Sequence, residues 1–266
     1  MKTVVVTGST RGIGLGLAEN FLKRGCKVVI TGRKQEAVDE VVNRFAGEFG
    51  ADKVAGTACD VASYDSLNNL WDFATDRFGR VDVWINNAGM SIERLPLWEQ
   101  SVDDIAAIVD TNLTGLLLAC KVAMAGMKEQ GGGQVWNMEG FGSNGMAQAG
   151  MSAYGATKRA VNYLNKSLRK DTEGTGIQVC TLSPGIVVTD LLLGDYDTSS
   201  EEWQKTRRIF NILADRVETV TPFLVDGVLK ADKDGAKVMW LTNGKVMRRF
   251  MTSRFVKRDV FEGMGI

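Results

Sequence analysis

The sequence predicts a single α/β domain built on a doubly wound sheet of seven parallel strands, with helices on both faces. Apolar runs such as TVVVTG and KVVITG are continuous rather than alternating, which is typical of strands buried on both faces. These runs alternate with segments of helical periodicity from the first residue to about residue 240. The 266 residues are 44% apolar and 24% charged, which suits one well-buried domain.

Each strand-like run is followed by a helical segment. The expected strands are TVVVTG, KVVITG, KVAGTACDV, VDVWINNAG, GQVWNM, IQVCTLSPG and AKVMWLT. The expected helices cover about Gly14–Lys23, Gln35–Phe49, Tyr64–Phe78 and Val102–Met127, and a further helix carries Tyr154 and Lys158. No repeat or linker divides residues 1–266, so we expect residues 1–130 to bind a cofactor mainly, 131–243 to hold the catalytic and substrate half, and 244–266 to form a basic amphipathic tail.

Composition excludes several classes of function. The chain has no histidine, which removes Ser-His-Asp hydrolysis, Cys-His proteolysis and the usual His-ligated catalytic zinc. The 32 basic and 32 acidic residues balance, so no attraction to nucleic acid is expected. The cysteines form no CxxC pair and no zinc spacing, so we expect buried thiols and no metal site; they are Cys26, Cys59, Cys120 and Cys180.

The start of the chain predicts a cytoplasmic location. KTVVVTGS leads straight into a strand, so we expect no signal or transit peptide. No apolar run was expected to reach membrane-spanning length.

The stretch TGSTRGIG, residues 7–14, is expected to bind the pyrophosphate of a dinucleotide. It follows the first strand and opens the first helix, where glycines allow a tight turn and free N–H groups face an anion. The spacing is GxxxGxG, which differs from the GxGxxG of other dinucleotide binders. This strand–turn–helix context predicts a Rossmann-type domain.

The end of the second strand predicts NADPH rather than NADH. In TGRK, Arg33 has no acidic neighbour to bind a ribose 2′-hydroxyl, and Arg11 in the glycine loop adds a second cation for a 2′-phosphate. The alternative is that both arginines are solvated surface residues.

Three further strand ends are expected to contact the cofactor, because ligands bind at the carboxyl ends of strands in open α/β sheets. CDV offers a carboxylate to adenine, NNAG leaves room for a ribose, and SPGIVVTD turns toward the nicotinamide carboxamide. The expected cofactor-binding residues are Gly8, Ser9, Thr10, Arg11, Gly12, Ile13, Gly14, Arg33, Asp60, Val61, Asn87, Ala88, Gly89, Tyr154, Lys158, Pro184, Gly185, Val187 and Thr189.

The ordered motifs TGxxxGxG, NNAG, a mid-chain Asn, YxxxK and PGxxxT resemble the short-chain dehydrogenase/reductase family over essentially the whole chain. WNMEGFGSNG, YGATKR, LSPGIVVTDLLL and FNILADRVETV are similar to the chlorophyll b reductase branch, which reduces a 7-formyl group to hydroxymethyl. The resemblance implies an NADPH-dependent carbonyl reductase that forms a homodimer or homotetramer through the helices of Asn112 and Tyr154.

Tyr154 and Lys158 lie four residues apart, so a helix places them on one face. A nearby ammonium favours the phenolate, which allows Tyr154 to give a proton to a carbonyl oxygen as hydride arrives. The resemblance implies that Lys158 also binds the nicotinamide ribose. It further implies that Asn112, in DTNLTG, holds a water in the proton path.

The family serine that holds the substrate oxygen is displaced. It usually lies three residues after the strand asparagine, where this chain has Gly140. Ser143 is three residues further on, in a glycine-rich loop that is able to bend tightly. We expect Ser143 to donate to the oxygen; a loop backbone N–H and Ser152 are the alternatives. Glu139 repels developing negative charge if it points into the site.

A bulky apolar substrate is expected from the residues near this site. Residues 189–215 suit a mobile lid, and Phe141, Met146, Met151 and residues 191–193 are able to line an adaptable pocket, although such methionines are more often core or interface. The tail KVMRRFMTSRFVKRDVF combines six cations with Met and Phe, which fits an anionic membrane surface, a hydrophobic substrate or a partner subunit.

Two other functions fit the same motifs. One keeps the chemistry and changes the substrate to a 3-oxoacyl, sugar or steroid-type carbonyl. The other is an NADP(H)-binding regulator with a catalytically weak site, which only the displaced serine supports.

Overall fold

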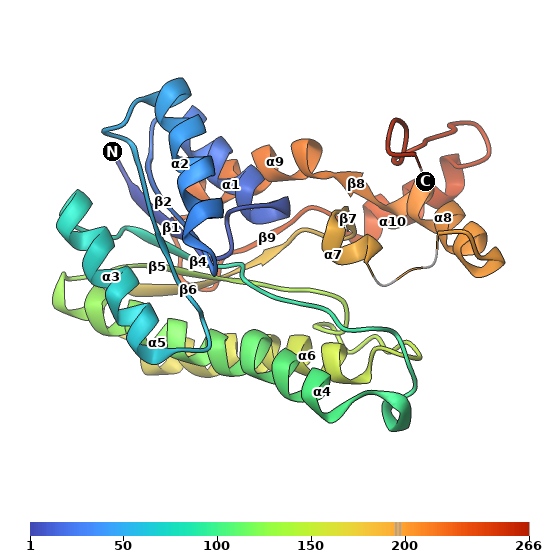
Figure 1. Cartoon of the computed structure of the whole chain (residues 1–266), viewed down its shortest axis with the longest axis horizontal. Helices are drawn as coiled ribbons and strands as arrows, with labels where there is room; N and C mark the ends of the chain where they lie inside the picture. Colours follow the sequence, from blue (N-terminus) through green and yellow to red (C-terminus); the bar gives the residue numbers. More distant parts are fainter. Residues whose placement is uncertain (195, 197, 266) are drawn as a thin grey trace.

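The computed structural model describes residues 1–194, 196 and 198–265, and it confirms the predicted doubly wound sheet (Figure 1). Seven strands pair in the order β3-β2-β1-β4-β5-β6-β9, and every pairing is parallel. The strands are β1 (Thr3–Val6), β2 (Lys27–Gly32), β3 (Val54–Ala58), β4 (Val83–Asn86), β5 (Gly133–Met138), β6 (Ile177–Ser183) and β9 (Lys237–Met239).

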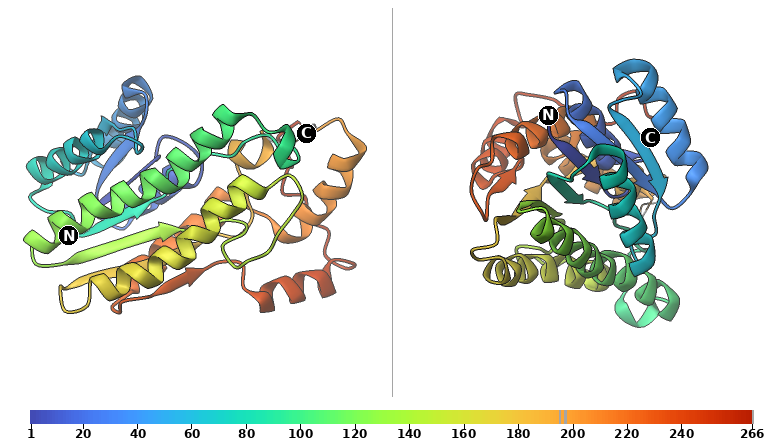
Figure 2. Two further views of the ribbon diagram at one scale, coloured as in Figure 1. Left: turned by 90° about the horizontal axis from the view of Figure 1, so that it is seen from below. Right: turned by 90° about the vertical axis from the view of Figure 1, so that its left-hand side faces the viewer.

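Helices cover both faces of this sheet (Figures 1 and 2). One face carries α1 (Gly12–Lys23), α2 (Gln35–Phe49) and α9 (Val217–Lys230). The other carries α3 (Tyr64–Phe78), α4 (Val102–Val109), α5 (Gly115–Glu129) and α6 (Ser152–Asp171). The short helices α7 (Asp190–Leu193), α8 (Glu201–Leu213) and α10 (Asn243–Thr252) lie together at the end of the molecule where the strands reach their carboxyl ends.

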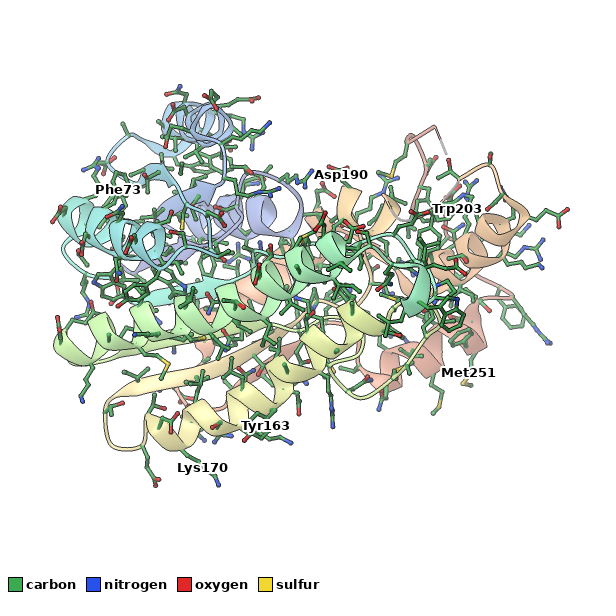
Figure 3. All side chains as sticks on the ribbon, turned by 60° about the horizontal axis from the view of Figure 1, so that its bottom comes forward. Phe73, Tyr163, Lys170, Asp190, Trp203 and Met251 are labelled. Atoms are coloured by element: carbon green, nitrogen blue, oxygen red, sulfur yellow. The ribbon has the colours of Figure 1, made fainter. Side chains whose placement is uncertain are left out.

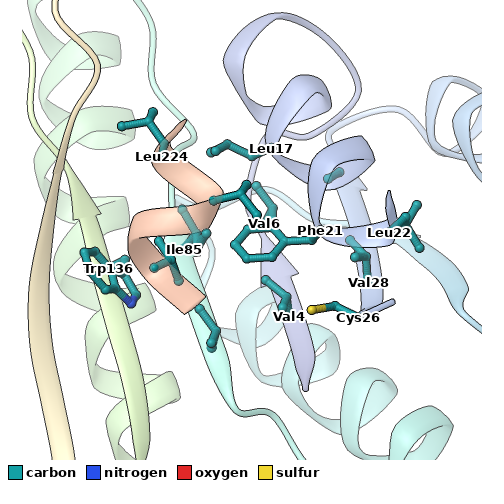
Figure 4. Close-up of a cluster of buried hydrophobic side chains, with 14 of the residues drawn as sticks. Val4, Val6, Leu17, Phe21, Leu22, Cys26, Val28, Ile85, Trp136 and Leu224 are labelled. Carbon is teal, nitrogen blue, oxygen red and sulfur yellow. The ribbon is translucent and has the colours of Figure 1, made fainter. Parts of the chain in front are cut away.

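The continuous apolar strands supply two cores, one on each face of the sheet. Val4 and Val6 face α1 and α9, where Phe21 and Trp136 are also buried (Figure 4), while Val5 faces the α3 and α5 side. Side chains of successive strand residues point to opposite faces, so a strand in the middle of three layers needs apolar residues at every position. The four cysteines are buried free thiols, as expected.

The helix predicted over Val102–Met127 is interrupted at the site. Asp110–Thr114 form a π-turn between α4 and α5, with Asn112 at its centre. Such π-turns widen the hydrogen-bonding pattern locally and are frequent at functional positions. By length and composition Val102–Glu129 would be able to span a membrane, contrary to the expectation from the sequence; in this fold α5 packs against α3, β4 and β5.

The C-terminal residues fold back onto the domain. Val260 and Phe261 are buried with Trp203 and Phe210 of α8 in a third, smaller core. A second sheet, not foreseen from the sequence, pairs β7 (Val187–Val188) with β8 (Asp215–Arg216) and closes the segment that carries α7 and α8.

Candidate active site

Tyr154 and Lys158 lie on one face of α6 and contact the residue that follows β5. A Cβ atom added to Gly140 would lie 2.6 Å from the Tyr154 hydroxyl and 3.2 Å from Cδ and Cε of Lys158. The Lys158 ammonium lies 5.8 Å from the centroid of the Tyr154 ring. Because the family serine position is Gly140, the Tyr154 hydroxyl occupies the space that a serine side chain would need here.

Lys158 is buried, and burial lowers the pKa of its ammonium from 10.5 to about 8. The Asn112 side chain is close to it: a Cβ atom on Gly89 would lie 3.2 Å from Asn112 Oδ1 and 3.7 Å from Lys158 Nζ. The Met90 backbone fixes the Asn112 amide by donating to Oδ1 at 2.8 Å and accepting from Nδ2 at 2.9 Å. Tyr154, Lys158 and Asn112 are therefore brought together as predicted.

The glycine-rich loop after β5 lies directly against α6. Gly142 has φ of +93°, and a Cβ atom there would lie 2.8 Å from the Gly155 Cα. Arg159 of α6 donates from its guanidinium to the Ser143 carbonyl at 3.0 Å. Close backbone contact at Gly142 and a side-chain bond from Arg159 together hold the loop on the helix that carries Tyr154.

Ser143 is buried beside Gly140. Its Oγ accepts a hydrogen bond from the Gly140 N–H at 3.1 Å, and its own N–H donates to the Gly140 carbonyl at 3.1 Å. Ser143 Oγ and the Tyr154 hydroxyl therefore both lie at Gly140. Ser152, the alternative donor, is exposed in the first turn of α6.

Glu139 is paired on another part of the sheet. Its buried carboxylate accepts from the Lys237 ammonium of β9 at 2.9 Å, and the ion pair lines a small cavity of about 120 Å³ between α6, β6 and β9. The lysine compensates the buried charge, so Glu139 is not an uncompensated charge in this fold.

At the cofactor end, side chains join the glycine loop to the neighbouring strand ends. Ser9 Oγ accepts from the Thr31 N–H at 2.9 Å, which fixes the loop beside β2. Asn87 donates to the carbonyls of Thr7 and Gly8 at 2.9 and 3.1 Å. A Cβ atom on Gly14 would lie 2.2 Å from the Gly8 carbonyl oxygen, so glycine is required where the loop enters α1.

These residues fit a dinucleotide. Gly8 and Gly12 have φ of +64° and +56°, values that glycine adopts at low cost. The first residues of α1 follow Arg11, whose side chain does not cap the helix, so backbone N–H groups there are available to a phosphate. A Cβ atom on Gly12 would lie 3.5 Å from Thr189, which brings the nicotinamide-end segment to the glycine loop.

The predicted phosphate-binding arginines are exposed but differ in their surroundings. Arg33 lies at the end of β2, next to Gly32, against which the Thr10 side chain packs. Arg11 lies 3.9 Å from the Asp190 carboxylate in a solvent-exposed ion pair of low strength. The Asp190 carboxylate therefore partly neutralises the charge of Arg11.

The remaining predicted cofactor residues lie along the same edge of the sheet. Asp60 is exposed and accepts from the Ala62 N–H, and Val61 packs against Gly115. Gly185 turns with φ of +75° against Leu241. Ala88 packs against Gly8, and Ile13 of α1 packs against the core. Pro184 follows β6, and Val187 is buried in β7.

The predicted apolar pocket is only partly assembled. Met151 is buried and Phe141 half-buried, whereas Met146 is exposed. Tyr154 packs in a small apolar cluster with Met90, Ile92, Ile108, Val109 and Ala153. A cavity of about 670 Å³ lies at the far end of α6, bordered by residues such as Lys166 and Gly174, and it contains none of the predicted site residues.

Sequence reasoning missed Arg94 and Arg159. The Arg94 guanidinium lies 4.2 Å from the Tyr196 ring and donates to its hydroxyl, which joins the loop after β4 to the segment between α7 and α8. The signal for Arg159 was the motif YGATKR, in which an arginine directly follows the catalytic-type lysine. No signal pointed to Arg94.

A glycine loop and a Tyr–Lys pair at the carboxyl edge of a parallel sheet define an oxidoreductase that acts on carbonyl or CH–OH groups with a nicotinamide cofactor. Residues 2–199 match the family model described as short chain dehydrogenase. The chain belongs to this family.

Similar proteins indicate which branch of this family the chain resembles. The chain is 40% identical over 230 residues to chlorophyll(ide) b reductase NOL, chloroplastic, of Oryza sativa subsp. japonica, covering 85% of this chain and 66% of that protein. It is 35% identical over 280 residues to the probable chlorophyll(ide) b reductase NYC1, chloroplastic, of Arabidopsis thaliana, covering 99% and 55%. The closed form of serine dehydrogenase complexed with NADP+ superimposes with a TM-score of 0.76 at 27% identity, covering 90% and 94%.

These comparisons confirm the chlorophyll b reductase-like resemblance. The chain spans between about half and two thirds of the length of these curated relatives. The prediction of a cytoplasmic location is wrong, because the relatives are chloroplastic proteins. The first residues of a chain that spans only part of its relatives' length do not indicate where the protein is located.

Proposed function

We propose that this protein uses NADPH to reduce the 7-formyl group of chlorophyll(ide) b to a hydroxymethyl group. The observation that carries the proposal is the meeting of the Tyr154 hydroxyl, the Lys158 side chain and Ser143 Oγ around Gly140. Such a group of a proton donor, a cation and a second hydroxyl suits a carbonyl oxygen that gains negative charge.

Tyr154 is the proton donor to the carbonyl oxygen. The cofactor supplies the hydride that reaches the carbonyl carbon. The Lys158 ammonium, which lies near the Tyr154 ring, stabilises the phenolate left after proton transfer. Since burial brings the pKa of Lys158 to about 8, the lysine exchanges protons readily near neutral pH.

Asn112 connects Lys158 to the proton supply. Its amide is held by Met90 at the π-turn and lies against Gly89. The family role of this asparagine is to hold a water that hands protons to Lys158. The fixed amide orientation supports that role here.

Ser143 is the second donor to the substrate oxygen. Its Oγ already accepts from the Gly140 N–H, so its hydroxyl proton remains available to donate. Arg159 holds the Ser143 carbonyl and thereby the position of the hydroxyl. Ser143, three residues later in the chain, thus takes the role of the family serine.

NADPH is the proposed cofactor because Arg33 follows β2 beside the glycine loop and no acidic residue adjoins it. The residues named at the carboxyl ends of β1, β2, β3, β4 and β6, with Tyr154 and Lys158 of α6, are the proposed binding set for the dinucleotide. The NADP+ in the similar serine dehydrogenase supports the same choice.

The substrate proposal comes from the named relatives at 35–40% identity and from the apolar surroundings of Tyr154. NADPH oxidation is to be measured with chlorophyllide b, with 3-oxoacyl thioesters and with simple aldehydes. We expect kcat/KM for chlorophyllide b to exceed the others by at least about tenfold, which corresponds to 1.4 kcal/mol. A higher value for a 3-oxoacyl thioester would indicate another substrate, and tight NADPH binding without any turnover would indicate a regulator.

Assembly into a homodimer or homotetramer through α4, α5 and α6 is part of the proposal. Leu117 of α5 is exposed on this helical layer, where an apolar side chain would be covered by a second subunit. Light scattering of the purified protein measures the assembly directly.

A further inference from the structure

Helix α10 is attached to the domain by its charged side. Arg249 donates to the Leu213 carbonyl at 2.8 Å and to the Asp215 carboxylate at 3.0 Å. Asp215 is buried and also accepts from Trp240 Nε1 and from Arg258, both at 2.6 Å. The inward side of α10 is therefore held by ion pairs and hydrogen bonds.

The outward side of α10 is apolar, which reverses the usual arrangement of a surface helix. Met247, Phe250 and Met251 follow the i, i+3, i+4 spacing of one helix face, and all three are exposed. Met251 is 71% exposed and Phe255, just beyond the helix, 87%. Figure 3 shows the Met251 side chain pointing away from the domain.

Single exposed apolar residues are ordinary, but this group is not scattered. Five large apolar side chains lie exposed within ten consecutive residues, 247–256, and they define what we call the α10 surface: Met247, Phe250, Met251, Phe255 and Val256. Folding has left this surface uncovered while burying the charged side of the same helix.

The charge of residues 244–258 indicates what kind of partner would bind there. Residues 244–258 contain six cations and no carboxylate, although the whole chain is neutral. Arg249 and Arg258 bind Asp215, whereas Arg248, Arg254 and Lys257 are exposed beside the α10 surface. An anionic partner is therefore favoured.

A second copy of the chain fits this surface poorly. In a two-fold interface in which this segment packs against its own copy, Arg248 and Arg254 of one copy would face the same cations of the other without a carboxylate from this segment. A lipid bilayer with anionic headgroups meets both requirements, because its acyl region accepts Met and Phe and its headgroups attract arginine and lysine.

We propose that the α10 surface binds an anionic lipid bilayer, with α10 lying parallel to the membrane plane. The helix lies beside α8, at the carboxyl end of the sheet, so a bound bilayer would be next to the end of the domain that holds the candidate site (Figure 1). This binding requires neither NADPH nor a carbonyl substrate.

The test is sedimentation of the full chain with vesicles made of phosphatidylcholine alone or of equal parts phosphatidylcholine and phosphatidylglycerol. We expect binding to the anionic vesicles, weakened by added salt, and little binding to the neutral ones. Met251→Asp should lower the partition coefficient on anionic vesicles about tenfold or more, because it puts a charge into the bilayer interface. Tyr64→Asp, at a 42% exposed site on α3, which is not among the helices of the proposed subunit interface, is the matched control and should have no effect beyond its added charge.

Three results would overturn the proposal. The first is that the native chain fails to sediment with anionic vesicles. The second is that the two variants lose binding equally. The third is a native assembly, seen by light scattering, that Met251→Asp dissociates, since a second copy then occupies the surface. Both substitutions lie at exposed sites, and unchanged circular dichroism and melting temperature establish that each variant is folded.

Discussion

At the residue scale, Ser143 is the group that distinguishes this site from the family pattern. Ser143→Ala removes the proposed second donor to the substrate oxygen. Loss of one donor in a site of this kind costs about 2.7–4 kcal/mol, so kcat should fall about 100-fold or more while NADPH affinity is unchanged. Steady-state kinetics and cofactor titration measure the two quantities, and a loss in kcat below about threefold would show that Ser143 only closes the turn.

Moving the serine back to its family position should not restore the activity. A Cβ atom at residue 140 would lie 2.6 Å from the Tyr154 hydroxyl, so Gly140→Ser displaces the proton donor. The double variant with Ser143→Ala and Gly140→Ser should therefore remain as slow as Ser143→Ala or slower. Recovery to native kcat would mean that the Gly140 contact is dispensable.

The buried Lys158 should make the protein without bound cofactor less stable at neutral pH. Its folded pKa of about 8 lies below its ordinary value of 10.5, so the fold disfavours the charged form. Between pH 8 and 10.5 the unfolded chain holds the extra proton, hence stability rises with pH across this window. Lys158→Met should remove a cost of about 3 kcal/mol at pH 7 and flatten that rise. Denaturant unfolding at several pH values tests this, and a destabilised variant with an unchanged pH dependence would contradict it.

Arg33 is the residue whose loss should change cofactor choice. Arg33→Ala removes a charge-assisted contact to the 2′-phosphate, which is worth about 1.5–3 kcal/mol. The kcat/KM for NADPH should fall about 10- to 100-fold, while that for NADH stays the same. Arg44→Ala, on the exposed part of α2, is the control. An equal fall with both cofactors would place Arg33 outside phosphate recognition.

At the scale of elements, the loop after β5 depends on close contact with α6. Gly142 and Gly145 have nearly equal φ, +93° and +92°, but an added Cβ meets the Gly155 backbone at 2.8 Å in the first case and only the Arg159 side chain, at 3.8 Å, in the second. Alanine at either position adds about 1–2 kcal/mol of backbone strain. Gly142→Ala should also displace Ser143, so its kcat should fall at least about tenfold further than that of Gly145→Ala. Equal kcat values for the two variants would show that loop contact does not position the serine.

Elements with a strong local pattern were predictable. The helices Gln35–Phe49 and Tyr64–Phe78 have their predicted bounds, because each shows one apolar face and the second ends at a glycine. The π-turn at Asn112 was not foreseen, since its cause is the packing of Asn112 on Met90 and not a break in the apolar pattern. The β7–β8 pairing joins residues 187 and 215, and no local signal records a contact at that separation.

At the scale of the whole molecule, the fold class followed from continuous buried strands alternating with helices. The placement of the candidate site was also predictable, because YxxxK and the glycine loop follow strand ends that meet at one edge of the sheet. The orientation of α10 was not predictable from the sequence. The periodicity of the helix indicates an apolar side, but only the contact with the buried Asp215 shows that the charged side faces inward.

Transfer of hydride from NADPH to the formyl carbon, with Tyr154 giving the proton, is the central claim. Single-turnover reaction of chlorophyllide b with NADPH deuterated at nicotinamide C4, as each of the two stereoisomers, tests it by mass spectrometry of the product. One stereoisomer should place a single deuterium on the hydroxymethyl carbon. Tyr154→Phe should bind NADPH normally and transfer the label about 100-fold or more slowly. A product without deuterium from either stereoisomer, or native transfer by Tyr154→Phe, would contradict the mechanism.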